Sequence, residues 1–239
     1  SQTSMSHLAQ RNIVELQQLM DAGDLSSAQL TQYYLDRIQQ YDVGEGGLNA
    51  VREINPLALT EAARLDQERR TSGPRSKLHG IPVLVKDNYA TKGMSTTAGS
   101  ILFADHEPPF DAHAVARLKQ AGAIILGKVN MHEFAYGITT VGSAFGATKN
   151  PYNLNRNPGG SSGGTGAAVA ADFAVFGMGS DTCGSIRIPA AHNNLVGLRG
   201  TQGLSSRFGI VPLSHTQDIG GPLARSTVDL ALALDVTVG

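Results

Sequence analysis

Residues 1–75 carry hydrophobic side chains at intervals of three and four positions, which places them on one face of a helix. Two stretches show this spacing, one with Ile13, Leu16, Leu19 and Met20, the other with Leu30, Tyr34, Leu35, Ile38 and Tyr41. Helix-starting residues precede the second stretch at Ser26-Ser27, and a third segment, Leu57–Arg70, at Asn55-Pro56. We therefore expect a helical lead-in over residues 1–75.

From Leu78 onward, short hydrophobic runs alternate with helical segments. The expected strands are Ile81–Val85, Ala123–Leu126 and Ala174–Met178. The expected helices are Ala112–Gln120, Thr165–Ala171 and a last one that Ser226 opens and that ends at Leu234. Such alternation indicates a sheet with helices on both of its faces. The expected fold is α/β, with a mixed central sheet and the helical lead-in.

Composition narrows the classes of function. The 239 residues are 41% hydrophobic and 16% charged, with a net charge of −1. Lys and Arg are scattered, so we expect no direct nucleic-acid binding, and no apolar run is long enough for a membrane span. Cys183 is the only cysteine, which excludes a scaffold built on intrachain disulfides and leaves the localisation open.

Two serines lie in glycine-rich segments, Ser161 within Pro158–Gly164 and Ser185 within Gly179–Pro189. Glycine permits positive φ and close backbone approach, so the amides of such a segment can converge on an oxyanion. Lys86 ends the hydrophobic run Ile81–Val85. A lysine there can extend to solvent, but a buried one loses its proton more readily and can act as a base.

Other catalytic arrangements fit the sequence less well. His79, His192 and His215 lie near these segments, yet no Gly-x-Ser-x-Gly turn directly follows an expected strand, with a histidine late in the chain, as an α/β-hydrolase needs. Gly164-Thr-Gly166 opens a helix as anion-binding loops do, but the motifs of phosphate and dinucleotide loops are missing. Metal-ligand spacings are missing as well. We expect neither a cofactor nor a metal.

Several separated motifs, in this order, resemble the amidase signature family. They are Leu78–Asn88, Gly127–Phe134, the serine-containing segments and Gly197–Gly239. The resemblance covers nearly the whole chain and implies one amidase signature domain over 1–239, with a catalytic core at 76–239. It also implies a Ser-Ser-Lys triad, in which Ser185 is the nucleophile, Ser161 the bridging serine on a cis peptide, and Lys86 the base.

The same resemblance implies roles for the residues around the triad. The backbone amides of Thr182, Cys183, Gly184 and Ser185 correspond to the oxyanion hole, and Ser162, Asp181 and Arg187 to residues that brace the site. We expect Cys183 to be a small buried residue rather than a catalytic thiol. Candidate wall residues of the substrate pocket, equally suited to the core, are Phe134, Tyr136 and Ile138.

The implied activity is hydrolysis of carboxylic amides to an acid plus ammonia or an amine, through a Ser185 acyl-enzyme. One alternative is the glutaminase subunit of a tRNA-dependent amidotransferase, which passes ammonia to a partner. Another is a catalytically inactive amidase-like binding module. The expected partner is a small-molecule amide. Family members continue beyond the helix that ends at Leu234, so we expect either a missing C-terminal segment or a homo-oligomer.

Overall fold

A six-stranded mixed sheet forms the centre of the part of the chain that the computed structural model describes, residues 5–239. Its strands are β1 (Val51–Ile54), β2 (Pro82–Lys86), β3 (Ile124–Val129), β6 (Phe176–Asp181), β7 (Val196–Gly197) and β8 (Ile219–Ala224). They lie in the order β1-β3-β2-β6-β8-β7. β2 runs parallel to both β3 and β6, and the other neighbours pair antiparallel. A separate ribbon pairs β4 (Val141–Gly142) with β5 (Gly146–Ala147).

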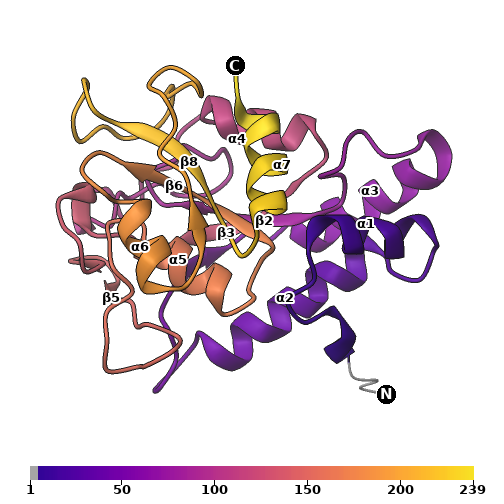
Figure 1. Cartoon of the computed structure of the whole chain (residues 1–239), viewed down its shortest axis with the longest axis horizontal. Helices are drawn as coiled ribbons and strands as arrows, with labels where there is room; N and C mark the ends of the chain where they lie inside the picture. Colours follow the sequence, from indigo (N-terminus) through magenta and orange to yellow (C-terminus); the bar gives the residue numbers. More distant parts are fainter. Residues whose placement is uncertain (1–4) are drawn as a thin grey trace.

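β2 and β3 are mainly hydrophobic because both faces of the central sheet are covered. Every residue of β2, β3, β6 and β8 is buried. The helices are α1 (Ile13–Asp21), α2 (Ser27–Tyr41), α3 (Ala58–Ser72), α4 (His113–Gln120), α5 (Gly163–Ala170), α6 (Arg187–His192) and α7 (Thr227–Thr237). Figure 1 shows α5 and α6 on one side of the sheet and α4 and α7 on the other. The expected mixed α/β fold is confirmed.

Two successive crossovers run in opposite directions along the sheet. The chain passes from β2 through α4 to β3, and then from β3 through α5 to β6 on the other side of β2. Right-handed crossovers in opposite directions place their helices on opposite faces of the sheet. A crevice therefore opens between the carboxyl ends of β2 and β6, where such sheets bind ligands.

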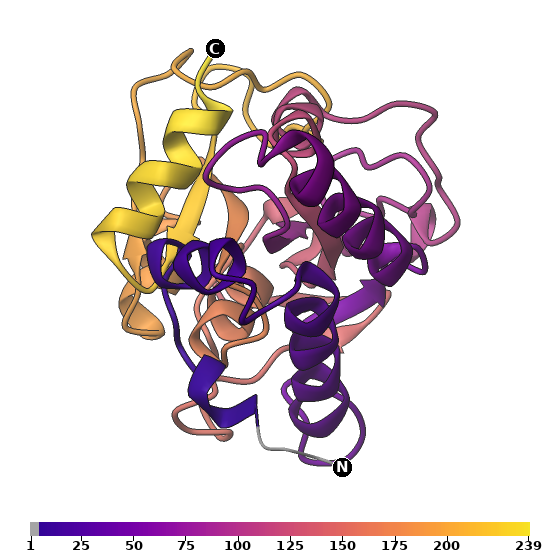
Figure 2. The same cartoon turned by 90° about the vertical axis from the view of Figure 1, so that its right-hand side faces the viewer.

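The lead-in is less purely helical than its pattern predicts. β1 lies within it and pairs with β3 at the edge of the central sheet. The pattern missed β1 because Val51–Ile54 is only four residues long and half-buried, and its two central residues are charged, so neither a hydrophobic run nor an alternation marks it. The lead-in also contacts α7: α1 lies beside the start of that helix (Figure 2), and the Ile13 amide donates to the Asp229 carboxylate at 2.9 Å.

Local capping explains several helix starts. Ser26 and Gln29 form a reciprocal capping box at the start of α2, and the Ser226 side chain caps α7. Asn55 does not cap α3, which begins at Ala58; its side chain instead accepts from the Leu57 amide at 2.9 Å. Three 3₁₀ turns complete the described residues: η1 (Met5–Leu8), η2 (Ile101–Phe103) and η3 (Glu133–Ala135).

Candidate active site

Lys86 lies at the carboxyl end of β2, in the crevice between β2 and β6. Its side chain is fully buried. The Nζ atom donates to Ser161 Oγ at 2.7 Å and to Ser180 Oγ at 2.8 Å, and lies 3.5 Å from the Ser180 carbonyl oxygen. Asn88 Nδ2 donates to the same Ser180 hydroxyl at 2.9 Å. The lysine amine therefore meets hydroxyl and carbonyl groups rather than a carboxylate.

Burial controls the charge of this amine. Removal from water lowers the pKa of Lys86 to about 7, although the negative charges of Asp181 and Asp218 act in the opposite direction. At neutral pH a large fraction of Lys86 is thus unprotonated and has a free lone pair. A neutral lysine 2.7 Å from a serine hydroxyl can accept its proton.

Ser161 is held by the turn that leads into α5. The Gly160–Ser161 peptide bond is cis, as the family resemblance implied. Thr140 Oγ1 donates to the Gly159 carbonyl at 2.7 Å and accepts from the Gly163 amide at 3.0 Å, and the His132 amide donates to the Ser161 carbonyl at 3.1 Å. These bonds surround Ser161 on both sides, so that its buried hydroxyl faces Lys86.

Ser185 belongs to the turn between β6 and α6, which Asp181 organises. The Asp181 carboxylate accepts from the amides of Gly184 at 3.0 Å, Ile186 at 3.0 Å and Arg187 at 3.3 Å. The Ser185 carbonyl in turn accepts from the Ser162 amide at 3.3 Å, which joins the two serine segments. Ser162 Oγ also donates to the Ser180 carbonyl at 3.1 Å.

Two arginines neutralise Asp181. Burial raises the pKa of this carboxyl, but hydrogen bonds from the Arg187 side chain and the turn amides outweigh burial and hold the pKa at about 2. Arg187 contacts Asp181 at 3.2 Å, and Arg199 contacts Asp181 Oδ1 at 2.8 Å. Sequence reasoning named Arg187 but missed Arg199. No local signal marks Arg199, because it approaches Asp181 from the loop after β7.

The turn offers several backbone donors for an oxyanion. Among the described residues, the amides of Thr182, Cys183 and Ser185 have no acceptor, whereas the Gly184 amide already donates to Asp181. Ser185 Oγ makes no hydrogen bond to Ser161 in residues 5–239. Its residue is 8% exposed against 0% for Ser161, so of the two serines it is Ser185 that meets the solvent.

The expectation of a buried Cys183 is wrong. The residue is exposed, with Sγ lying 3.8 Å from Gln217 Oε1. The turn after β6 faces outward at this position, so the side chain meets solvent instead of the hydrophobic core.

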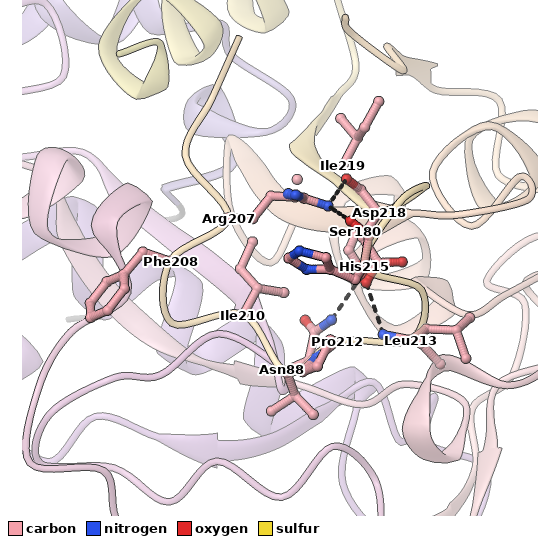
Figure 3. A pocket seen from close by; sticks show the side chains of 13 residues that line it. Asn88, Ser180, Arg207, Phe208, Ile210, Pro212, Leu213, His215, Asp218 and Ile219 are labelled. Carbon is pink, nitrogen blue, oxygen red and sulfur yellow. Dashed lines mark hydrogen bonds between the residues drawn. The ribbon is translucent and has the colours of Figure 1, made fainter. Parts of the chain in front are cut away.

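Two cavities flank this region and share Ala135 and Leu213 in their walls. The smaller, about 210 Å³, is lined by Ser185 and by mainly apolar neighbours: Ala135, Tyr136, Gly137, Ile138, Cys183 and Leu213. The larger, about 410 Å³, opens over Ser180 and Asn88, with Arg207, His215 and Asp218 around it (Figure 3).

The predicted wall residues divide between these cavities and the core. Tyr136 and Ile138 line the smaller cavity. Phe134 instead packs edge-on against Phe103, with ring centroids 5.9 Å apart.

The histidines take other positions. His79 is buried and its Nε2 lies 2.9 Å from the Leu65 carbonyl oxygen, His192 is exposed, and His215 borders the larger cavity. In residues 5–239 no histidine side chain hydrogen-bonds to the hydroxyl of Ser161 or Ser185, and no group of three or more His, Cys, Asp or Glu residues could hold a metal ion. None of the helices in these residues is long and apolar enough to cross a membrane.

Comparison with known proteins assigns the family. The Amidase family model matches residues 29–239. The A-type subunit of glutamyl-tRNA(Gln) amidotransferase from Thermus thermophilus is 46% identical over 225 residues, which cover 94% of this chain and 46% of that protein. The chain thus spans about half the length of the curated relatives it matches.

Similarity to solved structures supports the same family assignment. Peptide amidase from Stenotrophomonas maltophilia is 47% identical with a TM-score of 0.94, over 97% of this chain and 48% of that one. The A-type subunit of the glutamyl-tRNA(Gln) amidotransferase of Thermotoga maritima is 35% identical with a TM-score of 0.78, over 96% and 47%. Because the family model matches residues 29–239 and the chain is similar to these solved structures, the chain belongs to the amidase signature family.

Proposed function

We propose that this chain carries the machinery that breaks the C–N bond of a carboxylic amide through an acyl-enzyme on Ser185. The observation that supports it is the 2.7 Å contact between the buried Lys86 amine and Ser161, beside a Ser185 that opens into a cavity. Lys86 accepts the Ser161 proton while Ser161 accepts that of Ser185. The Ser185 oxygen then attacks the amide carbonyl, and the relay returns a proton to the departing nitrogen.

The surrounding residues have supporting roles in this proposal. The amides of Thr182, Cys183 and Ser185 bind the oxyanion, since the Gly184 amide is engaged by Asp181. Asp181, Ser162 and Arg187 hold the turn in place through the hydrogen bonds described above. Losing one oxyanion donor typically costs about 3 kcal/mol of transition-state stabilisation, so the geometry of this turn matters for the rate.

The fate of the acyl-enzyme and of the nitrogen separates two candidate functions. In an amidase, water releases the acid from Ser185 and ammonia or an amine leaves; similarity to peptide amidase supports this function. In the glutaminase subunit of an amidotransferase, ammonia from glutamine passes to a partner; the names of the curated relatives, 43–48% identical, favour this second function. The catalytically inactive binding module fits less well, because all three triad residues are present and Lys86 contacts Ser161.

Covalent labelling tests the shared step. A fluorophosphonate probe should modify Ser185, located by mass spectrometry, and Ser185→Ala should abolish both labelling and turnover. Ser72→Ala, an exposed serine at the end of α3, is the matched control. An adduct on Ser161 or Cys183 would contradict the assignment.

A substrate panel separates the two functions. Acetamide, benzamide, glutamine and a peptide amide should be compared for release of acid and ammonia by this chain. Turnover of peptide or simple amides indicates an amidase, and selective turnover of glutamine indicates the glutaminase subunit of an amidotransferase.

A further inference from the structure

Asp218 is a buried carboxylate that neutral hydrogen-bond donors hold in place. It precedes β8, and its carboxylate accepts from the amides of Leu213 at 2.8 Å and Ser214 at 3.0 Å and from the hydroxyl of Thr182. In the described residues it forms no ion pair; Arg207 contacts only its backbone carbonyl, at 3.4 Å. A buried carboxylate that has no cationic partner depends on its N–H and O–H donors. Loss of any one of these donors leaves a carboxylate oxygen unsatisfied, which costs free energy.

These donors come from two parts of the site that are far apart in sequence. Thr182 belongs to the oxyanion turn, residues 181–185. Leu213 lines both cavities, and Figure 3 shows its amide directed at Asp218. One carboxylate thus joins the turn that receives the oxyanion to the loop that walls the substrate cavities.

The side chain of Arg199 forms a second link between the oxyanion turn and the loop 213–218. Arg199 donates to the Asp181 carbonyl at 2.7 Å and, through its other terminal nitrogen, to the Gln217 carbonyl at 2.8 Å. The loop 213–218 is therefore linked to both residues at the start of the oxyanion turn, to Thr182 by the Asp218 carboxylate and to Asp181 through the side chain of Arg199.

We propose that Asp218 is a positioning residue that fixes the oxyanion turn through the Thr182 hydroxyl. The inference rests on the proposed function of Ser185. The Thr182 amide is one of the free donors of the turn, and tying its side chain to Asp218 sets the direction of that amide. Fixed donors stabilise an oxyanion without reorganisation, whereas a turn free to rotate does not.

Asp218 also acts on the charge of Lys86. The titratable groups that interact electrostatically with Lys86 are Asp181 at the end of β6, Asp218 just before β8, and His132 in the loop after β3. Both carboxylates favour the protonated lysine, so removing the charge of Asp218 lowers the Lys86 pKa further. The acid limb of the pH–rate profile therefore reports the charge of Asp218, whereas kcat at its plateau reports the position of the turn.

The test compares isosteric changes on the two sides of the contact. Thr182→Val removes the hydroxyl and should lower kcat at least about tenfold with little change in KM, since misplacement of catalytic groups acts on the transition state. Thr182→Ser keeps the hydroxyl and should restore the rate lost in Thr182→Val. Thr60→Val makes the same chemical change at an exposed position of α3, away from the site, and is the matched control.

Asp218→Asn should lower kcat and move the acid limb of the pH–rate profile to lower pH. A Thr182→Val rate equal to that of Thr60→Val would overturn the proposal, even if Asp218→Asn fails to fold. Absence of Ser185 labelling in the parent protein would instead overturn the proposed function, so the two failures are distinguishable.

Discussion

In the proposed mechanism, the amine of Lys86 must be unprotonated to accept the Ser161 proton. A protonated lysine has no lone pair, so activity should rise with pH through about 7, where burial places the Lys86 pKa. Lys86→Ala should lower kcat by about 10²–10⁴-fold, the usual contribution of a general base, and lose that pH dependence. A pH–rate profile checks both, with the exposed Lys77→Ala as control. A variant profile that matches the parent would remove Lys86 from the mechanism.

The same burial has a consequence for stability. Between pH 7 and the ordinary lysine pKa of 10.5, the unfolded chain binds a proton at Lys86 that the folded protein largely lacks. Stability of the parent should therefore rise with pH across this window. Lys86→Met carries no such proton and should be more stable at pH 7, by an amount that shrinks as the pH approaches 10.5. Denaturant unfolding across this range measures the difference, and a pH-independent difference would contradict it.

At the scale of elements, α5 can approach β3 only because position 164 is glycine. The Gly164 amide donates to the Asn130 carbonyl at 3.0 Å, and a Cβ there would overlap that carbonyl oxygen. Glycine to alanine inside a helix ordinarily gains up to about 1 kcal/mol. Here we expect Gly164→Ala to cost about 1–3 kcal/mol by overpacking, and to slow Ser185 labelling because Ser161 shifts with α5.

Thermal unfolding and the labelling rate together check this prediction. Gly200→Ala is the control, since its added Cβ would meet only the flexible end of Leu204 at 3.3 Å. Gly164→Ala with parent stability and parent labelling would show that the close approach does not position Ser161.

At the scale of the whole molecule, large apolar side chains surround the cavities. Tyr136, Ile138 and Phe208 are 80%, 59% and 64% exposed. Because apolar surface gathered at one place favours dye binding and association, the chain should bind a hydrophobic dye and self-associate with increasing concentration. Dye fluorescence and sedimentation test this. Tyr136→Ser should weaken both, whereas Leu57→Ser, also exposed but on the lead-in, should not. A dye-silent monomer would contradict the prediction.

The sequence by itself determined the helices and strands that are marked by a local hydrophobic run or by a capping residue. The hydrophobic runs of β2 and β3 and the capped starts of α2 and α7 were confirmed, because burial on both faces and side-chain caps act within a few residues. The order of the motifs also led to the family, which the comparisons show. The triad roles stay predictions, now with a 2.7 Å contact between Lys86 and Ser161 to support them.

Only the tertiary structure decided the features that depend on distant residues. β8 contains two glycines and a proline, so its strand character comes from pairing with β6 rather than from propensity. Arg199 and Asp218 reach the oxyanion turn from later loops, and Cys183 is exposed because that turn faces outward. Helix and strand propensities depend on residues that are neighbours in the sequence. The contacts of β8, Arg199 and Asp218 instead depend on strand ends that the chain's crossovers bring together in space.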